Sequence, residues 1–299
     1  MNKKVLTMAV MAAVCGMAAA PVWAANSGGT VNGDGKFVGD NGAADNRLLI
    51  DEDSRQEIIS GLGTGNDKVQ NNSIEVSAGT ISERIIGGMS EGDGDIDYNS
   101  VTISGGKMSE AVYGAYTEGS GIVAYNSVTL TDGLINGEVY GGASTKNGIA
   151  EYNSVTVSGG TINMLATGGV SIDNVARYNN VTVTGGTIKG SIYGGMSEIN
   201  AIENKVMISG GNIGGDVCGA ESKAESSATG NEVIISGTPT FESAYGTNIY
   251  GASTFDGEIT GNKVTISGRP VFKFNDPDKN IKIYGGYVDR DGNVTGNSV

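Results

Sequence analysis

An asparagine that opens a short Asn-x-Val-like segment recurs through this chain at a nearly fixed interval, and this repeat constrains the fold more than any other feature. Across the first eight of these asparagines the interval is 25 to 27 residues, and it then lengthens to 31 and 35. The repeated residues are Asn46, Asn72, Asn99, Asn126, Asn153, Asn179, Asn204, Asn231, Asn262 and Asn297. Self-similarity at such a period is typical of solenoids and arrays, in which each repeat is one structural unit.

Each repeat begins with residues that alternate between apolar and hydroxyl side chains. After Asn126, for example, Val128 and Leu130 alternate with Ser127 and Thr129, which is the period of a half-buried strand. A glycine pair then breaks the strand. Two further apolar positions follow, one nine residues after the asparagine and one beside a Tyr-Gly landmark. They are Ile81, Met108, Ile135, Ile162, Ile188 and Ile213, and then Val112, Val139, Ile192 and Val217. This pattern predicts three short strands and three turns per repeat.

One repeat cannot bury its few apolar side chains alone, but coils stacked about 4.8 Å apart align them into one core. We therefore predict an all-β, right-handed parallel β-helix of about nine coils over residues 46–299, with the hand taken from the crossover rule. Leucine-rich repeats and propeller blades fit the period and composition less well. In the last two complete repeats, Phe241 and Phe272 hold the same offset, so we expect their rings to stack between coils.

The two ends of the chain differ from the repeat. Lys3 and Lys4, an apolar stretch and Val22-Trp23-Ala24 predict an export signal over residues 1–24, so the protein is expected to be exported. Residues 25–45 carry no repeat and are predicted to form a leader or N-terminal cap.

The formal charge of −14 argues against nucleic acid as a partner and against direct insertion into a membrane. Cys218 is the cysteine that is left after cleavage of the export signal. It occupies the position that tyrosine holds in neighbouring repeats, so we expect it to have a packing role.

With the repeat written as N-x-V-x-I-S-G-G-x-I-x-G-x-I-Y-G-G, residues 46–299 resemble the glycine-rich passenger region of bacterial autotransporters, the type V secreted surface proteins. The resemblance implies a β-helix displayed outside a Gram-negative outer membrane, often as an adhesin. Members of that family carry a C-terminal translocator barrel, which this sequence does not include. The chain ends at Asn297, Ser298 and Val299, the opening of another repeat, so we expect a fragment or a truncated chain whose bare last coil associates end to end.

The composition excludes much enzyme chemistry. The sequence contains no histidine, which excludes Ser-His-Asp and Cys-His machinery and any His-ligated metal. The alternating carboxylates of Asp93, Asp95 and Asp97 are compatible with a calcium loop or with a solvated acidic turn. The EF-hand pattern fails, because Tyr98 stands where its glycine should be and Ser104 where its glutamate should be. We therefore predict no catalytic residue, no metal site and no cofactor.

Two files of tyrosines are candidate binding strips. One file is Tyr113, Tyr140, Tyr193, Tyr250 and Tyr284, and the other is Tyr98, Tyr125, Tyr152 and Tyr178. Such files can present aromatic rings to a glycan or to a protein. Stacking between coils accounts for them equally well, so the ligand-binding residues stay unknown at this stage.

Together these patterns predict an exported, non-enzymatic β-helix that acts in adhesion or surface display. Its partner would be a glycan or a host or cell-surface protein, and its location the cell surface, the outer membrane or the exterior of a Gram-negative-type bacterium. One alternative is a carbohydrate-active β-helix enzyme, a polysaccharide lyase or glycosidase that uses carboxylates. Another alternative is a structural spacer.

Overall fold

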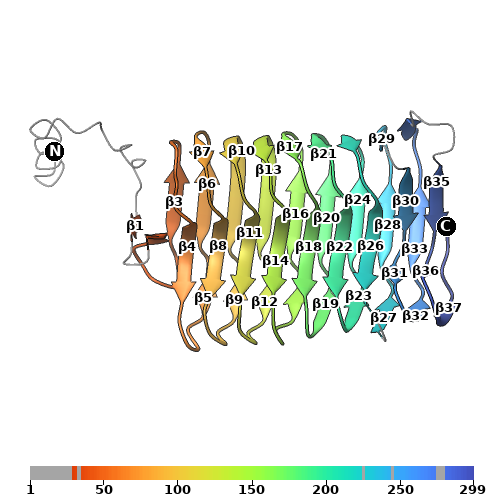
Figure 1. Cartoon of the computed structure of the whole chain (residues 1–299), viewed down its shortest axis with the longest axis horizontal. Coiled ribbons are helices and arrows are strands. Elements are labelled where there is room, and N and C mark those ends of the chain that lie inside the picture. Colours follow the sequence, from red (N-terminus) through yellow and green to blue (C-terminus); the bar gives the residue numbers. More distant parts are fainter. Residues whose placement is uncertain (1–28, 32–34, 224–225, 244–245, 274–279) are drawn as a thin grey trace, which may run out of the picture.

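The described part of the chain is an all-β rod of stacked parallel coils, as predicted, and it contains no helix. The structure is a computed structural model that describes residues 29–31, 35–223, 226–243, 246–273 and 280–299. Figure 1 shows the coils side by side along the rod, each next to the coil that follows it in the sequence. The predicted signal peptide at residues 1–24 lies outside the described residues.

Three sheets run along the rod. The first has thirteen strands: β1 Gly29–Val31, β2 Phe37–Gly39, β4 Ile58–Gly63, β8 Ile85–Ser90, β11 Val112–Thr117, β14 Val139–Ser144, β18 Ala166–Ser171, β22 Ile192–Ser197, β26 Val217–Ser222, β30 Thr247–Tyr250, β31 Ser253–Thr254, β35 Ile281–Tyr284 and β36 Tyr287–Val288. Apart from β1 with β2, every pairing in this sheet is parallel.

The second sheet follows the repeat asparagines and has fifteen strands: β3 Arg47–Ile50, β6 Ser73–Val76, β7 Thr80–Ile81, β10 Ser100–Met108, β13 Ser127–Ile135, β16 Ser154–Val157, β17 Thr161–Ile162, β20 Asn180–Val183, β21 Thr187–Ile188, β24 Lys205–Ile208, β25 Asn212–Ile213, β28 Glu232–Ile235, β29 Thr240–Glu242, β33 Lys263–Ile266 and β34 Val271–Lys273.

The third sheet precedes the asparagines and has nine strands: β5 Val69–Gln70, β9 Ile96–Asp97, β12 Val123–Ala124, β15 Ala150–Glu151, β19 Val175–Arg177, β23 Asn200–Ile202, β27 Ser226–Thr229, β32 Gly257–Thr260 and β37 Gly292–Thr295. Nine strands are separated by eight steps, and the rod has about eight turns where the repeat predicts about nine coils.

One coil contains more strands than the sequence pattern predicts. In the coil that follows Asn153, the chain forms β16, the short β17, β18 and then β19 before it reaches Asn179. The predicted three strands per coil are found after Asn99 (β10, β11 and β12) and after Asn126 (β13, β14 and β15), whereas after Asn153 the strand of the second sheet is divided into β16 and β17. The strands of the third sheet are only two to four residues long. Such short segments carry too few residues to show a period.

The main core is one continuous cluster of apolar side chains inside the coils, with several from each coil. The inward positions predicted from the alternation are buried, including Val155 and Val157 of β16 and Ile162 of β17. Phe241 and Phe272 stack with ring centroids 5.0 Å apart, as predicted. Because coil-to-coil register pairs like with like, each apolar side chain packs on its counterpart one coil away.

The repeat asparagines form a buried ladder along the interior. Each side-chain amide donates to the side-chain oxygen of the next asparagine, at 2.7 to 3.1 Å over nine links. The same oxygen also accepts the backbone N–H of the preceding asparagine, as Asn153 does from Asn126 at 3.0 Å. Because these groups are buried, the ladder satisfies backbone groups at the corner between the third and second sheets.

The turn conformation at this corner belongs to the residue before each asparagine and not to the asparagine itself. Positive φ angles occur at Tyr98, Tyr125, Tyr152 and Tyr178, between 54° and 58°. In the last repeats the same slot holds Gly230, Gly261 and Gly296. A bulky residue is uncommon in this left-handed region, so the tyrosines carry backbone strain that the glycines avoid.

The glycine pair of the landmark is explained by close packing across the coil. A Cβ on Gly141 would lie 2.4 Å from the backbone oxygen of Gly168 and 2.6 Å from the backbone nitrogen of Ser154. A Cβ on Gly142 would lie 2.6 Å from the side chain of Asn153. The pair therefore lets the first sheet approach the second sheet and leaves room for the asparagine ladder.

At the N-terminal end, part of the predicted leader joins the rod. β2 pairs in parallel with β4, and β1 pairs with β2 in antiparallel fashion. Phe37 is buried in the core. The cap over residues 25–45 as a whole stays a prediction, because residues 25–28 and 32–34 lie outside the described part.

Candidate functional site

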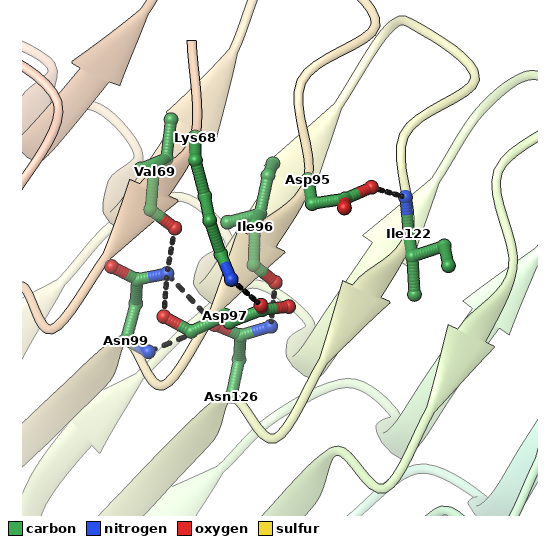
Figure 2. Close-up of polar contacts among 8 residues, drawn as sticks. All are labelled: Lys68, Val69, Asp95, Ile96, Asp97, Asn99, Ile122 and Asn126. Atoms are coloured by element: carbon green, nitrogen blue, oxygen red, sulfur yellow. Dashed lines mark hydrogen bonds and ion pairs between the residues drawn. The ribbon is translucent and has the colours of Figure 1, made fainter.

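The acidic turn is built of carboxylates that bind neighbouring coils. Asp95 accepts a hydrogen bond from the Ile122 backbone N–H one coil later, at 2.9 Å, and Asp97 lies 2.7 Å from the ammonium of Lys68 one coil earlier (Figure 2). The hydrogen bond and the charge of Asp97 raise the pKa of Lys68. The backbone oxygen of Asp97 accepts a hydrogen bond from the Asn99 side chain at 3.0 Å, so the acidic turn adjoins the asparagine ladder (Figure 2).

The third carboxylate is engaged in the same way. Asp93 accepts from the backbone N–H of Ser120 at 2.9 Å and from its hydroxyl at 2.8 Å. These hydrogen bonds, the backbone one first, lower the pKa of Asp93. Within the described residues, no group of three or more acidic or cysteine side chains converges as a metal site would require. Each of the three carboxylates is accounted for by a contact with a neighbouring coil.

The tyrosines that precede the asparagines form a tight stack. Tyr98, Tyr125, Tyr152 and Tyr178 follow one another at 4.9 to 5.0 Å between ring centroids, with interplanar angles of 2° to 12°. Tyr125 and Tyr152 stack on a ring on both sides, whereas Tyr98 and Tyr178, at the two ends of the file, each stack on one ring. A ligand that stacks on an aromatic ring needs a free face. The two inner rings therefore act as an aromatic ladder between coils rather than as a stacking platform.

The second tyrosine file lies on the outer face of the first sheet, because the residue before each ring points into the core. It is interrupted, since Thr167 and Cys218 hold tyrosine slots, in register with Tyr140, Tyr193 and Tyr250. The rings of Tyr113 and Tyr140 stack at 5.0 Å, and those of Tyr250 and Tyr284 at 5.6 Å. Most of these rings are half-buried on that face.

A neighbouring file of side chains partly covers these tyrosines. It lies three residues further along each strand: Leu62, Met89, Tyr116, Ala143, Val170, Met196, Glu221, Ser253 and Tyr287. A straight strand would place residues three apart on opposite faces. Yet Tyr113 meets Tyr116 edge-on at 5.3 Å. The strand therefore bends at the glycine pair, and the two files face each other across an external trough.

Sequence reasoning did not identify this neighbouring file, which runs from Leu62 to Tyr287. Its members differ in size and polarity from one repeat to the next, so they carry no common signal beyond their offset of three from the tyrosine slot.

Towards the C-terminal end the trough opens into a cleft of about 520 Å³. Its lining includes Glu221, Tyr250, Ser253, Phe255 and Tyr287. Tyr287 lies 5.3 Å from Tyr250 with the ring planes tilted by 33°. Phe255 is 40% exposed at the rim. A smaller hollow of about 150 Å³ adjoins the cleft, since Glu221 lines both.

Charged groups of both signs lie around the cleft. Glu221 and Asp289 supply two carboxylates, and Lys223 and Arg290 supply two cations. Burial raises the pKa of Glu221, against a hydrogen bond from Tyr193 and the charge of Lys223. The guanidinium of Arg290 lies 4.2 Å from the centre of the Phe255 ring, which is a cation–π contact.

Cys218 lies buried behind the cleft, in the tyrosine slot where packing was predicted. Its sulfur lies 2.8 Å from the carbonyl oxygen of Ala220 and 3.5 Å from the hydroxyl of Ser253. Burial raises the pKa of its thiol to about 12, so the thiol stays protonated near neutral pH. A protonated, buried thiol is a poor nucleophile, which agrees with a packing role.

Comparisons of the chain with family models, with curated proteins and with solved structures give no match. The resemblance to autotransporter passengers therefore depends on the repeat, with which the solenoid architecture is consistent. No helix in the described part of the chain is long and apolar enough to cross a membrane.

Proposed function

We propose that this chain is an exported, non-enzymatic β-helix of the autotransporter-passenger type and that it acts in adhesion or surface display outside a Gram-negative-type cell. The proposal rests on the contrast between the recurrent positions of the repeat and the variable ones. Its recurrent positions hold the rod together from inside, as the core valines and isoleucines and the asparagine ladder do. The residues that vary between repeats line the outer trough. A rigid scaffold with a variable outer surface suits recognition.

Two further observations support a binding role. Quasi-one-dimensional stacking presents an extended surface, which solenoids use for binding partners. An apolar hollow with a few polar groups around it is a usual place for a ligand, and the cleft at Tyr250 and Tyr287 has that composition. The partner on this reading is a glycan or a host or cell-surface protein.

The test is to expose the purified mature chain to arrays of glycans and of extracellular matrix proteins, and to incubate it with polysaccharides while monitoring released sugars. Binding to at least one array class without sugar release supports adhesion. Release of reducing or unsaturated sugars would instead favour the carbohydrate-active enzyme. A chain that is inert in both assays would overturn the adhesive proposal and favour a spacer.

A further inference from the structure

At the cleft, the outer file of the trough has a small residue, Ser253, between two larger ones. Ser253 is in register with Glu221 on one side and with Tyr287 on the other. Earlier in the same file, Met89 and Tyr116 fill the equivalent positions, and the trough there is closed by their contacts with Ile86 and Tyr113. The hydroxymethyl group of a serine leaves the space that such a side chain would occupy.

Tyr287 at the cleft is not stacked in the way that the ladder rings are. Tyr287 is tilted by 33° to Tyr250 and by 47° to Tyr284, whereas the ladder rings lie within 12° of parallel. Tyr287 is therefore not part of a parallel stack. Tyr287 and Phe255, which is 40% exposed and carries the Arg290 guanidinium over its ring, line the cleft with apolar ring surface that a flat ligand could contact.

The charges argue against an anionic ligand. Glu221 and Asp289 supply two carboxylates that line the cleft, Lys223 lines it as a cation, and Arg290 lies beside it on Phe255. The ammonium of Lys223 is moreover paired with Glu198 at 2.7 Å. The whole chain carries a formal charge of −14, which repels anions at longer range. An uncharged ligand with many hydroxyl groups could still hydrogen-bond these side chains.

The shape favours a linear ligand. The smaller hollow continues from Glu221 past Met196 to Val170, one coil at a time along the file. From Val170 to Tyr287 the file takes four steps, which at about 4.8 Å each is roughly 19 Å. The hollows thus follow the rod axis and do not form a round pocket.

From these observations we infer that the trough between Val170 and Tyr287 is a binding site for a linear, uncharged oligosaccharide. One pyranose ring stacks on Tyr287 in the cleft at Ser253, and Glu221 accepts hydrogen bonds from sugar hydroxyls. The site deepens the proposed adhesive function and rests on it, because it names a neutral glycan as the partner and places the contact.

The experiment is isothermal titration of the mature chain with cellohexaose, chitohexaose, maltohexaose and laminarihexaose, with oligogalacturonate as an anionic comparator. We expect at least one neutral hexasaccharide to bind and oligogalacturonate not to bind. Ser253→Tyr restores a large ring to the file and should abolish binding. Tyr287→Ala should weaken binding about tenfold, whereas Tyr287→Phe, which keeps the ring, should bind within about threefold of wild type.

Ala143→Tyr is the matched control, because it adds the same ring to the same file outside the cleft. It should bind like wild type, and circular dichroism shows whether both tyrosine variants fold. Equal binding by Ser253→Tyr and wild type would overturn the site, as would the absence of binding to every neutral hexasaccharide. If the chain still bound a matrix protein or another glycan in the array assay, the proposed adhesive function would be retained. Only the assignment of the cleft as an oligosaccharide-binding site would then be refuted.

Discussion

The asparagine ladder makes a quantitative prediction for Asn153→Ala in the middle of the rod. The Asn153 side chain makes four hydrogen bonds. Its oxygen accepts from the backbone and side-chain nitrogens of Asn126, both at 3.0 Å, and its nitrogen donates to Val123 O at 2.8 Å and to Asn179 Oδ1 at 3.1 Å. Substitution by alanine leaves two N–H groups of Asn126 and the Val123 carbonyl without these partners, whereas Asn179 Oδ1 still accepts from the Asn153 backbone N–H at 3.0 Å.

Each buried group that loses its partner costs about 1–3 kcal/mol. Three such groups predict a loss of roughly 3–9 kcal/mol, and we expect the lower half of this range because water can enter beside a truncated side chain. The assay is urea unfolding followed by circular dichroism, combined with hydrogen exchange to detect local opening, since solenoids need not unfold in one step.

Asn174→Ala is the control for this prediction. The Asn174 side chain also makes hydrogen bonds, to Asn147 O at 2.7 Å and from the Val175 N–H at 2.8 Å, but it lies in a surface turn. Its replacement should cost no more than about 1 kcal/mol. If Asn153→Ala were as mild as Asn174→Ala, the ladder would not be the element that fixes the coils in register.

Three further predictions follow from burial and backbone conformation. Val155→Asp buries an unpaired charge and should cost several kcal/mol, whereas Thr156→Asp, on the outer side, should stay within about half a kcal/mol; equal losses of stability would refute the inside/outside assignment. Tyr152 has φ of 54°, so Tyr152→Gly should be more stable than Tyr152→Ala by roughly 1 kcal/mol, although both lose the stacking; the opposite order would show that this position carries no strain. Residues 262–299 include apolar side chains such as Val294, which is 50% exposed, so the chain made alone should show fast hydrogen exchange there and concentration-dependent light scattering; a protected, monodisperse monomer would contradict this.

The sequence alone predicts the coil but not its corners. The spacing of the asparagines and the alternation at Val155 and Val157 are enough to predict stacked parallel strands and the inward residues, because both signals repeat in every coil. The corner is different. Tyrosine is an uncommon residue at positive φ, so nothing in the pattern assigns the turn to Tyr152 rather than to Asn153.

The candidate site was less predictable still. Sequence reasoning found Tyr250 and Tyr284 as members of an outward file, but the cleft also needs Glu221, Ser253 and Tyr287, which share no residue type. Their meeting depends on the bend at the glycine pair. The angle of that bend is set by packing of the first sheet against the second, which no local pattern encodes.

The most direct test of this account measures the rise per coil. Spin labels would be placed at outward positions of the second sheet in a Cys218→Ser background, pairing Thr102 with Met207 or with Ile234. These residues are four and five register steps apart in the structure. The label-to-label distance distributions measured by pulsed electron–electron double resonance should be narrow. Their mean distances should differ by about 4.8 Å between the two pairs. Broad distributions, or two distances that do not increase with the number of coils, would contradict the stacking of one repeat per coil.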